Sequence, residues 1–185
     1  MATQIHFKAS AGQVWRNMGF FEEVSGKPPM LLRALLPRPV RTAGDKTLVG
    51  SIVRCEYAEG ELIKRITQVE TARSLQFEVV KQRLGIEECV EALGGSYEIR
   101  SRGEETDIKL ITNYRAHLRP RLLWRNLEGL LIGQVHRHIL RGLSKTIQRE
   151  NQRSVVPLLA EVPGERASRG SLDCTVSPSP SRRSS

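Results

Sequence analysis

The feature that most constrains the fold of this sequence is a succession of strand-like segments followed by one long helical segment. Five segments are rich in β-branched residues or alternate between apolar and polar side chains. They are residues 47–57, 61–70, 74–82, 96–101 and 106–114. Short turns separate these segments, as at Ala58-Glu59-Gly60. Closely spaced strands joined by short turns predict an antiparallel meander.

The helical segment runs from Arg121 to about Arg149, directly after Pro120, a residue well suited to a first helical position. Apolar residues recur on one stripe of this helix, and basic residues recur at four-residue spacing roughly opposite. The apolar stripe is Leu131, Val135, Ile139, Leu143 and Ile147, and the basic row is Arg137, Arg141, Lys145 and Arg149. This pattern predicts a helix that closes the concave side of the sheet and turns its basic face to solvent.

The N-terminal part adds smaller elements. We expect a short strand over 4–8, an N-cap at Ser10 before a small helix, and a second helical piece over 20–24. Residues 25–46 contain four prolines and are expected to be irregular. Within them lies the apolar segment MLLRALL (30–36), which either covers a pocket as a lid or packs into the core under a long loop.

The chain has 185 residues, of which 39% are hydrophobic, and this length suggests one domain. The periodic patterns end near residue 153, and Ser, Pro, Gly and Arg accumulate after it. Such a composition buries too little apolar surface to offset its ordering entropy. We therefore expect a folded domain over 1–153 and a disordered Ser/Pro/Arg-rich tail over 154–185.

Charge and cysteine content narrow the function classes. The net charge of +9 favours anionic partners, and an anionic membrane surface is one possible partner of this kind. Nucleic acid is not expected, because few aromatic residues alternate with the basic ones. There is no signal peptide pattern and no membrane-spanning apolar run, so a cytoplasmic location is expected. The three cysteines, at 55, 89 and 174, are too widely spaced for a zinc motif, and neither a metal nor a cofactor is predicted.

Three stretches carry a resemblance to a known superfamily. They are ASAGQVW (9–15), the segment GSIVRCEYAEGELIKRITQVETARSLQFEV (50–79), and NYRAHLRPRLLWRN (113–126) with HRHILRGL (136–143). Over residues 3–150 the chain resembles the START-like (SRPBCC) superfamily, and in particular its uncharacterised bacterial branch similar to polyketide cyclases and dehydrases. The resemblance implies an α+β helix-grip fold, in which a curved antiparallel sheet wraps around a long C-terminal helix. It also implies a cavity between sheet and helix that holds a hydrophobic small molecule, a lipid or a polyketide.

Within that expected fold, we predict a set of cavity-lining residues from their apolar or amphipathic side chains. They are Trp15, Tyr57, Phe77, Tyr97, Leu110, Tyr114, Val135 and Ile139. His136 and His138 stand two apart on a helix and point in different directions, so they cannot share a metal ion.

Catalysis has a weaker basis in the sequence. Arg54, Glu56 and Lys64 are charged residues within otherwise apolar alternation. Arg54 and Glu56 share one face of their strand. If that face lines the cavity, Glu56 could accept a proton and Arg54 could stabilise an oxyanion in an aldol-type cyclisation. If it faces solvent, both are ordinary surface charges, and Val53, Cys55 and Tyr57 on the other face suit the interior better.

Three functions therefore stay open. The first is binding of a hydrophobic small molecule or lipid, and the second is a cyclase- or dehydrase-like reaction in the same cavity. The second requires a buried ionisable pair, which the sequence alone does not reveal. The third is peripheral binding to an anionic membrane. No oligomeric state follows from the sequence.

Overall fold

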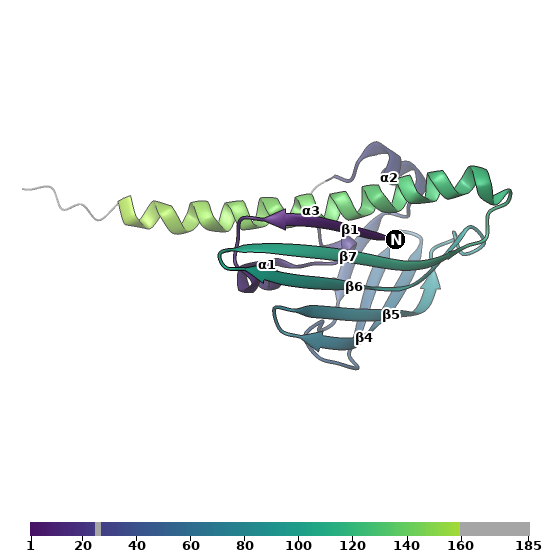
Figure 1. Ribbon diagram of the computed structural model, residues 1–185. Helices are drawn as coiled ribbons and strands as arrows, with labels where there is room; N and C mark the ends of the chain where they lie inside the picture. Colours follow the sequence, from purple (N-terminus) through teal and green to yellow (C-terminus); the bar gives the residue numbers. More distant parts are fainter. Residues whose placement is uncertain (25–26, 160–185) are drawn as a thin grey trace, which may run out of the picture.

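A computed structural model describes residues 1–24 and 27–159 of the chain. One strand and short helical elements precede a run of consecutive strands, and a long helix follows them, as expected for an α+β domain (Figure 1). In chain order they are β1 (Ala2–Phe7), α1 (Ala11–Asn17), the 3-10 turn η1 (Phe21–Glu23), α2 (Met30–Leu35), β2 (Pro39–Ala43), β3 (Ile52–Tyr57), β4 (Gly60–Glu70), β5 (Ser74–Arg83), β6 (Val90–Arg102), β7 (Glu105–Ala116) and α3 (Arg121–Leu159).

The seven strands form one antiparallel sheet in the order β1-β7-β6-β5-β4-β3-β2. Strands β2 to β7 form a meander in which every strand pairs with the next one along the chain. The first strand pairs instead with the last one, so that Ile5 lies opposite Ile108. The sheet curves beneath α3 (Figure 1). The predicted helix-grip architecture is confirmed.

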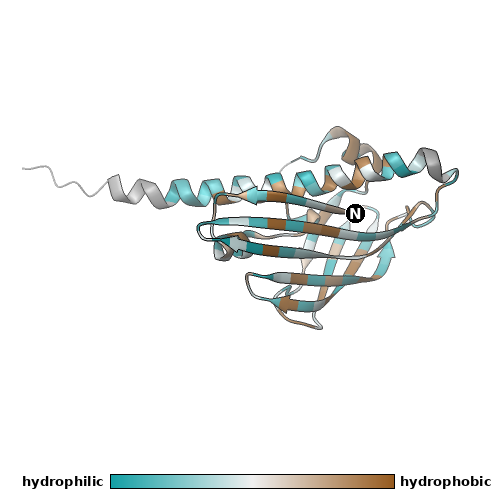
Figure 2. Cartoon of the chain, viewed as in Figure 1, coloured by the Kyte–Doolittle hydropathy of each residue, from teal (hydrophilic) through white to brown (hydrophobic). Residues whose placement is uncertain are grey.

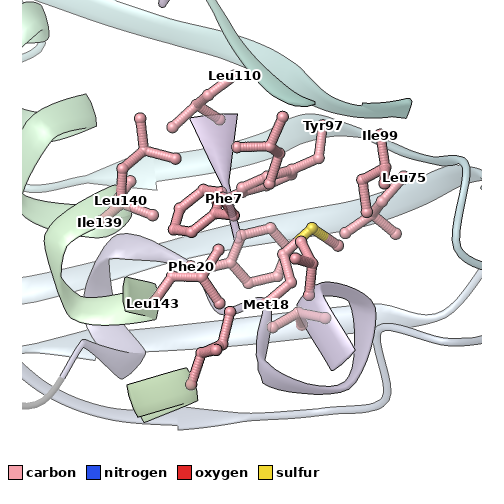
Figure 3. Close-up of a cluster of buried hydrophobic side chains, with 14 of the residues drawn as sticks. Phe7, Met18, Phe20, Leu75, Tyr97, Ile99, Leu110, Ile139, Leu140 and Leu143 are labelled. Atoms are coloured by element: carbon pink, nitrogen blue, oxygen red, sulfur yellow. The ribbon is translucent and has the colours of Figure 1, made fainter. Parts of the chain in front are cut away.

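Alternation along the strands produces the apolar face of the sheet, as the banding in Figure 2 shows. On β3, Val53 and Cys55 are fully buried while Arg54 between them is exposed. The buried side chains of several strands meet residues from α1, α3 and the segment before η1 (Figure 3). Those labelled in the close-up are Phe7, Met18, Phe20, Leu75, Tyr97, Ile99, Leu110, Ile139, Leu140 and Leu143.

Helix α3 buries the stripe that the sequence predicts. Ile139, Leu143 and Ile147 are buried, and Leu131 and Val135 are half-buried. The basic row, Arg137, Arg141, Lys145 and Arg149, is exposed. His136 is completely buried between helix and sheet, where its two ring nitrogens are each 2.8 Å from a threonine hydroxyl, those of Thr3 and Thr112.

Several predicted boundaries are wrong. The strand expected over 47–57 begins only at Ile52, because residues 47–51 form turns. The region 25–46, expected to be irregular, contains α2 and the edge strand β2. Strand β6 begins at Val90, six residues before the expected segment. Helix α3 ends at Leu159 rather than near Arg149, and residues 160–185 of the predicted tail lie outside the described residues.

Candidate functional site

An internal pocket lies between the sheet and α3. We call it the inner pocket, and its volume is about 170 Å³. Its walls are mostly apolar and come from β3 to β7, from α3, and from the segments around η1 and α2. Of the predicted cavity residues, Tyr57, Phe77, Tyr97, Leu110, Tyr114, Val135 and Ile139 line it. Trp15 does not, because α1 places its ring against the core elsewhere.

A second hollow, the outer pocket, has a volume of about 270 Å³ and shares walls with the inner pocket. The residues common to both are Leu36, Ile86, Val90, Tyr114, Ile132 and Val135. Trp124 and Leu127 of α3 add further apolar surface to the outer pocket. Together the two pockets reach the range of roughly 300–1,000 Å³ that drug-sized ligands occupy.

The segment 30–36 borders these pockets only at its C-terminal end. Leu35 and Leu36 line the outer pocket, whereas Leu32 is buried and Met30 is 83% exposed. The segment therefore combines both alternatives that the sequence left open: it packs through Leu32 and borders the pocket through its last two leucines.

A β-bulge in β5 shapes the wall opposite α3. In the pairing of β4 with β5, Ile63 lies opposite Lys81 but Lys64 lies opposite Val79, so Val80 is an extra residue. The extra residue reverses the alternation, and Gln82 consequently faces the inner pocket. Its side-chain amide donates to the carbonyl oxygen of Val90 (2.9 Å) and accepts from the backbone of β6 (2.7 Å). Gln82 thereby bridges β5 and β6 beyond the last backbone pairing between them.

The polar part of the inner pocket is a cluster of Glu22, Lys64 and Tyr57, which we call the buried triad. The ammonium nitrogen of Lys64 lies 2.8 and 3.0 Å from the two carboxylate oxygens of Glu22. The Tyr57 hydroxyl donates to the same carboxylate over 2.6 Å. The side chains of Lys64 and Glu22 are only 6% and 2% exposed. A charged pair is thus buried at the wall of an apolar pocket.

Residues around η1 hold Glu22 in this position. The carboxylate of Glu23 accepts from the backbone N–H of Phe20 (2.6 Å) and from the ammonium of Lys46 (2.8 Å). The hydroxyl of Tyr97 donates to the carbonyl oxygen of Gly19 (2.9 Å). These contacts pin the turn to the sheet from both sides. Glu23 consequently points outward, and Glu22 points into the pocket.

Electrostatics keep Glu22 and Tyr57 each in one protonation state at neutral pH. Burial alone would raise the pKa of the Glu22 carboxyl, but the Lys64 ammonium and the Tyr57 hydroxyl more than offset this and lower it. Burial, together with the neighbouring Glu22 charge, raises the pKa of Tyr57 far above its ordinary value. Glu22 is therefore an anion and Tyr57 a neutral hydrogen-bond donor.

The proposed clamp of Arg54 and Glu56 does not line the cavity. Their side chains are 57% and 37% exposed on the outer face of β3. Arg54 faces Glu61 at 3.7 Å, and Glu56 accepts from Arg41 over 2.9 Å. The strand alternation that buries Val53 and Cys55 turns these two charges outward, so the interpretation of them as a pocket pair is wrong.

Of the three charged strand residues singled out in the sequence, Arg54, Glu56 and Lys64, only Lys64 lies in the pocket wall. It shares the inward register of β4 with Leu62 and Ile66, which are buried. A lysine in that register needs a buried partner. Its partner Glu22 is 42 residues away, on a short turn whose position no local pattern specifies.

The other histidines and the cysteines of the described residues form no metal site. Within residues 1–24 and 27–159, no group of three or more His, Cys, Asp or Glu residues could hold a metal ion. His138 is separate from His136, as expected, and its ring packs against Phe21 at 5.7 Å between centroids. Both cysteines in the described part, Cys55 and Cys89, are free thiols.

No protein-family model and no curated protein sequence matches this chain. Solved structures do match. Norcoclaurine synthase from Thalictrum flavum, in complex with dopamine and hydroxybenzaldehyde, aligns with a TM-score of 0.53 at 13% identity, over 80% of this chain and 86% of the enzyme. The protein XoxI from Bacillus cereus aligns with a TM-score of 0.53 at 13% identity, over 80% and 94% of the two chains. TTHA0849 from Thermus thermophilus aligns with a TM-score of 0.52 at 13% identity, over 81% and 97%.

These neighbours share with this chain the helix-grip arrangement of a curved antiparallel sheet around a long C-terminal helix. At such identities the likeness concerns the fold alone. Fold does not determine function, so the function has to be argued from the pockets and the buried triad. Among the described residues, no helix is both long and apolar enough to span a membrane.

Proposed function

We propose that this protein binds a hydrophobic small molecule between its sheet and α3. The observation that carries the proposal is the mostly apolar inner pocket, beside which lies an apolar outer pocket with lining residues in common. Burying an apolar ligand in such walls gains roughly 25 cal/mol per Å² of surface removed from water. The buried triad supplies the few convergent polar groups typical of a ligand site.

The neutral fluorophore N-phenyl-1-naphthylamine tests this proposal. We expect its fluorescence to rise and saturate at one equivalent per chain. Val135→Phe, which fills space at the junction of both pockets, should weaken binding at least tenfold. The matched control is Val80→Phe, because Val80 is 41% exposed on the outer face of the bulge and should leave binding unchanged.

Overpacking alone can destabilise a core, so unfolding curves of both variants accompany the titration. Ala92→Leu fills the inner pocket from the opposite wall and provides a second obstruction if Val135→Phe does not fold. Absence of saturable binding to the unaltered protein, or equal binding by the filled and control variants, would refute the proposal. Native mass spectrometry of the purified protein would identify a ligand that is retained during purification.

The buried triad also favours a second candidate function, proton transfer to and from a carbonyl compound, as in polyketide cyclases and dehydrases. Glu22 would accept a proton from the carbon next to a carbonyl group, and the third hydrogen of the Lys64 ammonium would be donated to the enolate oxygen. We expect the protein to accelerate deuterium exchange of 2-tetralone in D2O, measured by NMR. Glu22→Gln should abolish the acceleration, and exchange at the rate of buffer alone would exclude this candidate.

A further inference from the structure

The hydrogen-bonding capacity of the buried triad restricts the ligand more narrowly than the pocket walls do. The Lys64 ammonium has three hydrogens. Two are directed to the carboxylate oxygens of Glu22. Among the described residues no other oxygen accepts from this nitrogen. Apart from the thiol of Cys55, it faces the Phe20 ring at 4.1 Å and the Phe77 ring at 5.4 Å from their centroids. The third hydrogen of the Lys64 ammonium, a strong donor, therefore faces only aromatic rings and a weak sulfur acceptor.

The triad also has an unused acceptor. The Tyr57 hydroxyl donates to Glu22, but within the described part of the chain its own oxygen accepts no hydrogen bond. The carboxylate of Glu22 already accepts twice from Lys64, once from Tyr57 and once from its own backbone N–H, so its four lone-pair sites are occupied. All three side chains line the inner pocket. The triad can thus donate one hydrogen bond and accept another at the same spot.

The charge of the triad decides which ligand group fits. Glu22 is negative, Lys64 is positive and Tyr57 is neutral, so the cluster has no net charge to offer. A ligand carboxylate placed there would be an uncompensated charge in an apolar pocket, which is strongly unfavourable. A hydroxyl group is neutral and both donates and accepts.

The volume indicates what surrounds that hydroxyl group. An engineered apolar cavity of about 150 Å³ holds one benzene ring. The inner pocket is slightly larger at about 170 Å³, and Phe20 and Phe77 on its wall are suited to contact a flat ring. The outer pocket, which has lining residues in common with the inner one, offers space beside it for the remainder of a larger ligand.

We infer that the ligand is a neutral, ring-containing alcohol or phenol whose hydroxyl group accepts from Lys64 and donates to the Tyr57 oxygen at the polar wall of the inner pocket. This inference rests on the proposed binding function. It excludes fatty acids and other apolar carboxylates, which a purely hydrophobic pocket with a free lysine would prefer.

Three compounds of equal ring size test the inference: naphthalene, 2-naphthol and 2-naphthoate, titrated at pH 7 by fluorescence or calorimetry. We expect 2-naphthol to bind at least tenfold more tightly than naphthalene, and 2-naphthoate to bind more weakly than naphthalene. Equal affinities of naphthol and naphthalene, or tightest binding of naphthoate, would overturn the inference while leaving the binding function intact. Failure of both naphthalene and naphthol to bind would overturn the binding function as well.

Variants then assign the preference to the triad. The double variant Glu22→Gln with Lys64→Met removes both charges together and should reduce the naphthol preference to less than threefold, with naphthalene affinity within twofold of the original. Tyr57→Phe retains the ion pair and should lower naphthol affinity alone, by several-fold. Arg54→Met is the matched control, because Arg54 is exposed on the outer face of the neighbouring strand, and should change neither affinity. Full retention of the naphthol preference in the double variant and in Tyr57→Phe would overturn the assignment.

Discussion

His136 should make the folding stability of this protein fall steeply in mild acid. Its side chain is fully buried and lies 2.8 Å from the hydroxyls of both Thr3 and Thr112. Burial lowers its pKa from the ordinary 6.5 to about 4. The unfolded chain therefore takes up a proton at this histidine at a higher pH than the folded chain does. Stability from this group is complete above pH 6.5 and is lost progressively as the pH falls toward 4.

The size of the effect follows from the two pKa values. At pH 4.5 almost every unfolded molecule carries the proton and only a minority of folded molecules do, which corresponds to about 2.5 kcal/mol of lost stability. We expect urea unfolding curves at pH 7.5 and pH 4.5 to show this loss in the unaltered protein. His136→Gln keeps a side chain capable of hydrogen bonds but cannot titrate, so its stability should change by about 2.5 kcal/mol less between the two pH values.

A control variant separates titration from a simple loss of contacts. Thr3→Val removes one hydrogen-bond partner of His136 and should cost about 1–3 kcal/mol at both pH values. Its pH dependence should nevertheless resemble that of the unaltered protein. Parallel pH dependences of the unaltered protein and His136→Gln would refute the claim that burial holds this histidine neutral.

Three further predictions concern thiol reactivity, glycine geometry and helix capping. Ellman's reagent should modify Cys89 rapidly and Cys55 only on unfolding, because Cys55 is fully buried and burial raises the pKa of its thiol to about 11; equal rates would contradict this. Gly94→Ala should lower the melting temperature markedly, because its φ is +147° and its Cβ would clash with the carbonyl oxygen of Phe77 in β5. Gly129→Ala meets nothing within 4 Å in α3 and should add about 0.5–1 kcal/mol of stability. Ser10→Ala should cost about 1 kcal/mol in urea unfolding, because the Ser10 hydroxyl accepts from a backbone N–H of α1 over 3.3 Å; no change would mean that this cap is dispensable.

The sequence predicts those parts of the fold that depend on local periodicity. Alternation located β4, β5 and β7 to within about a residue or two, and four-residue spacing located the buried stripe of α3. Strand β2 was missed because it begins at Pro39 in a proline-rich region, and as an edge strand it has pairing on one side only. The early start of β6 was missed because its first residues have no clean alternation.

The candidate site was less accessible to sequence reasoning. The pocket-lining tyrosines follow from strand alternation, so Tyr57, Tyr97 and Tyr114 could be named in advance. The buried triad could not, because it depends on a contact between β4 and a three-residue turn. Lys64 was visible as a charge within an apolar pattern, and its register with Leu62 and Ile66 placed it inside. Nothing in the sequence around Glu22 indicates that it is the partner of Lys64.

The pairing of β1 with β7 has a consequence for how the chain acquires its structure. Strands β2 to β7 can form by successive hairpins between neighbours, but His6 must find Asp107, across 101 positions of chain. Closing so long a loop is entropically costly, and non-local pairings slow folding. During synthesis β1 is made before its partner β7. The backbone donors and acceptors of β1 therefore stay unpaired with β7 until β7 has been made. We expect β1 to be the last strand to dock and the first to detach.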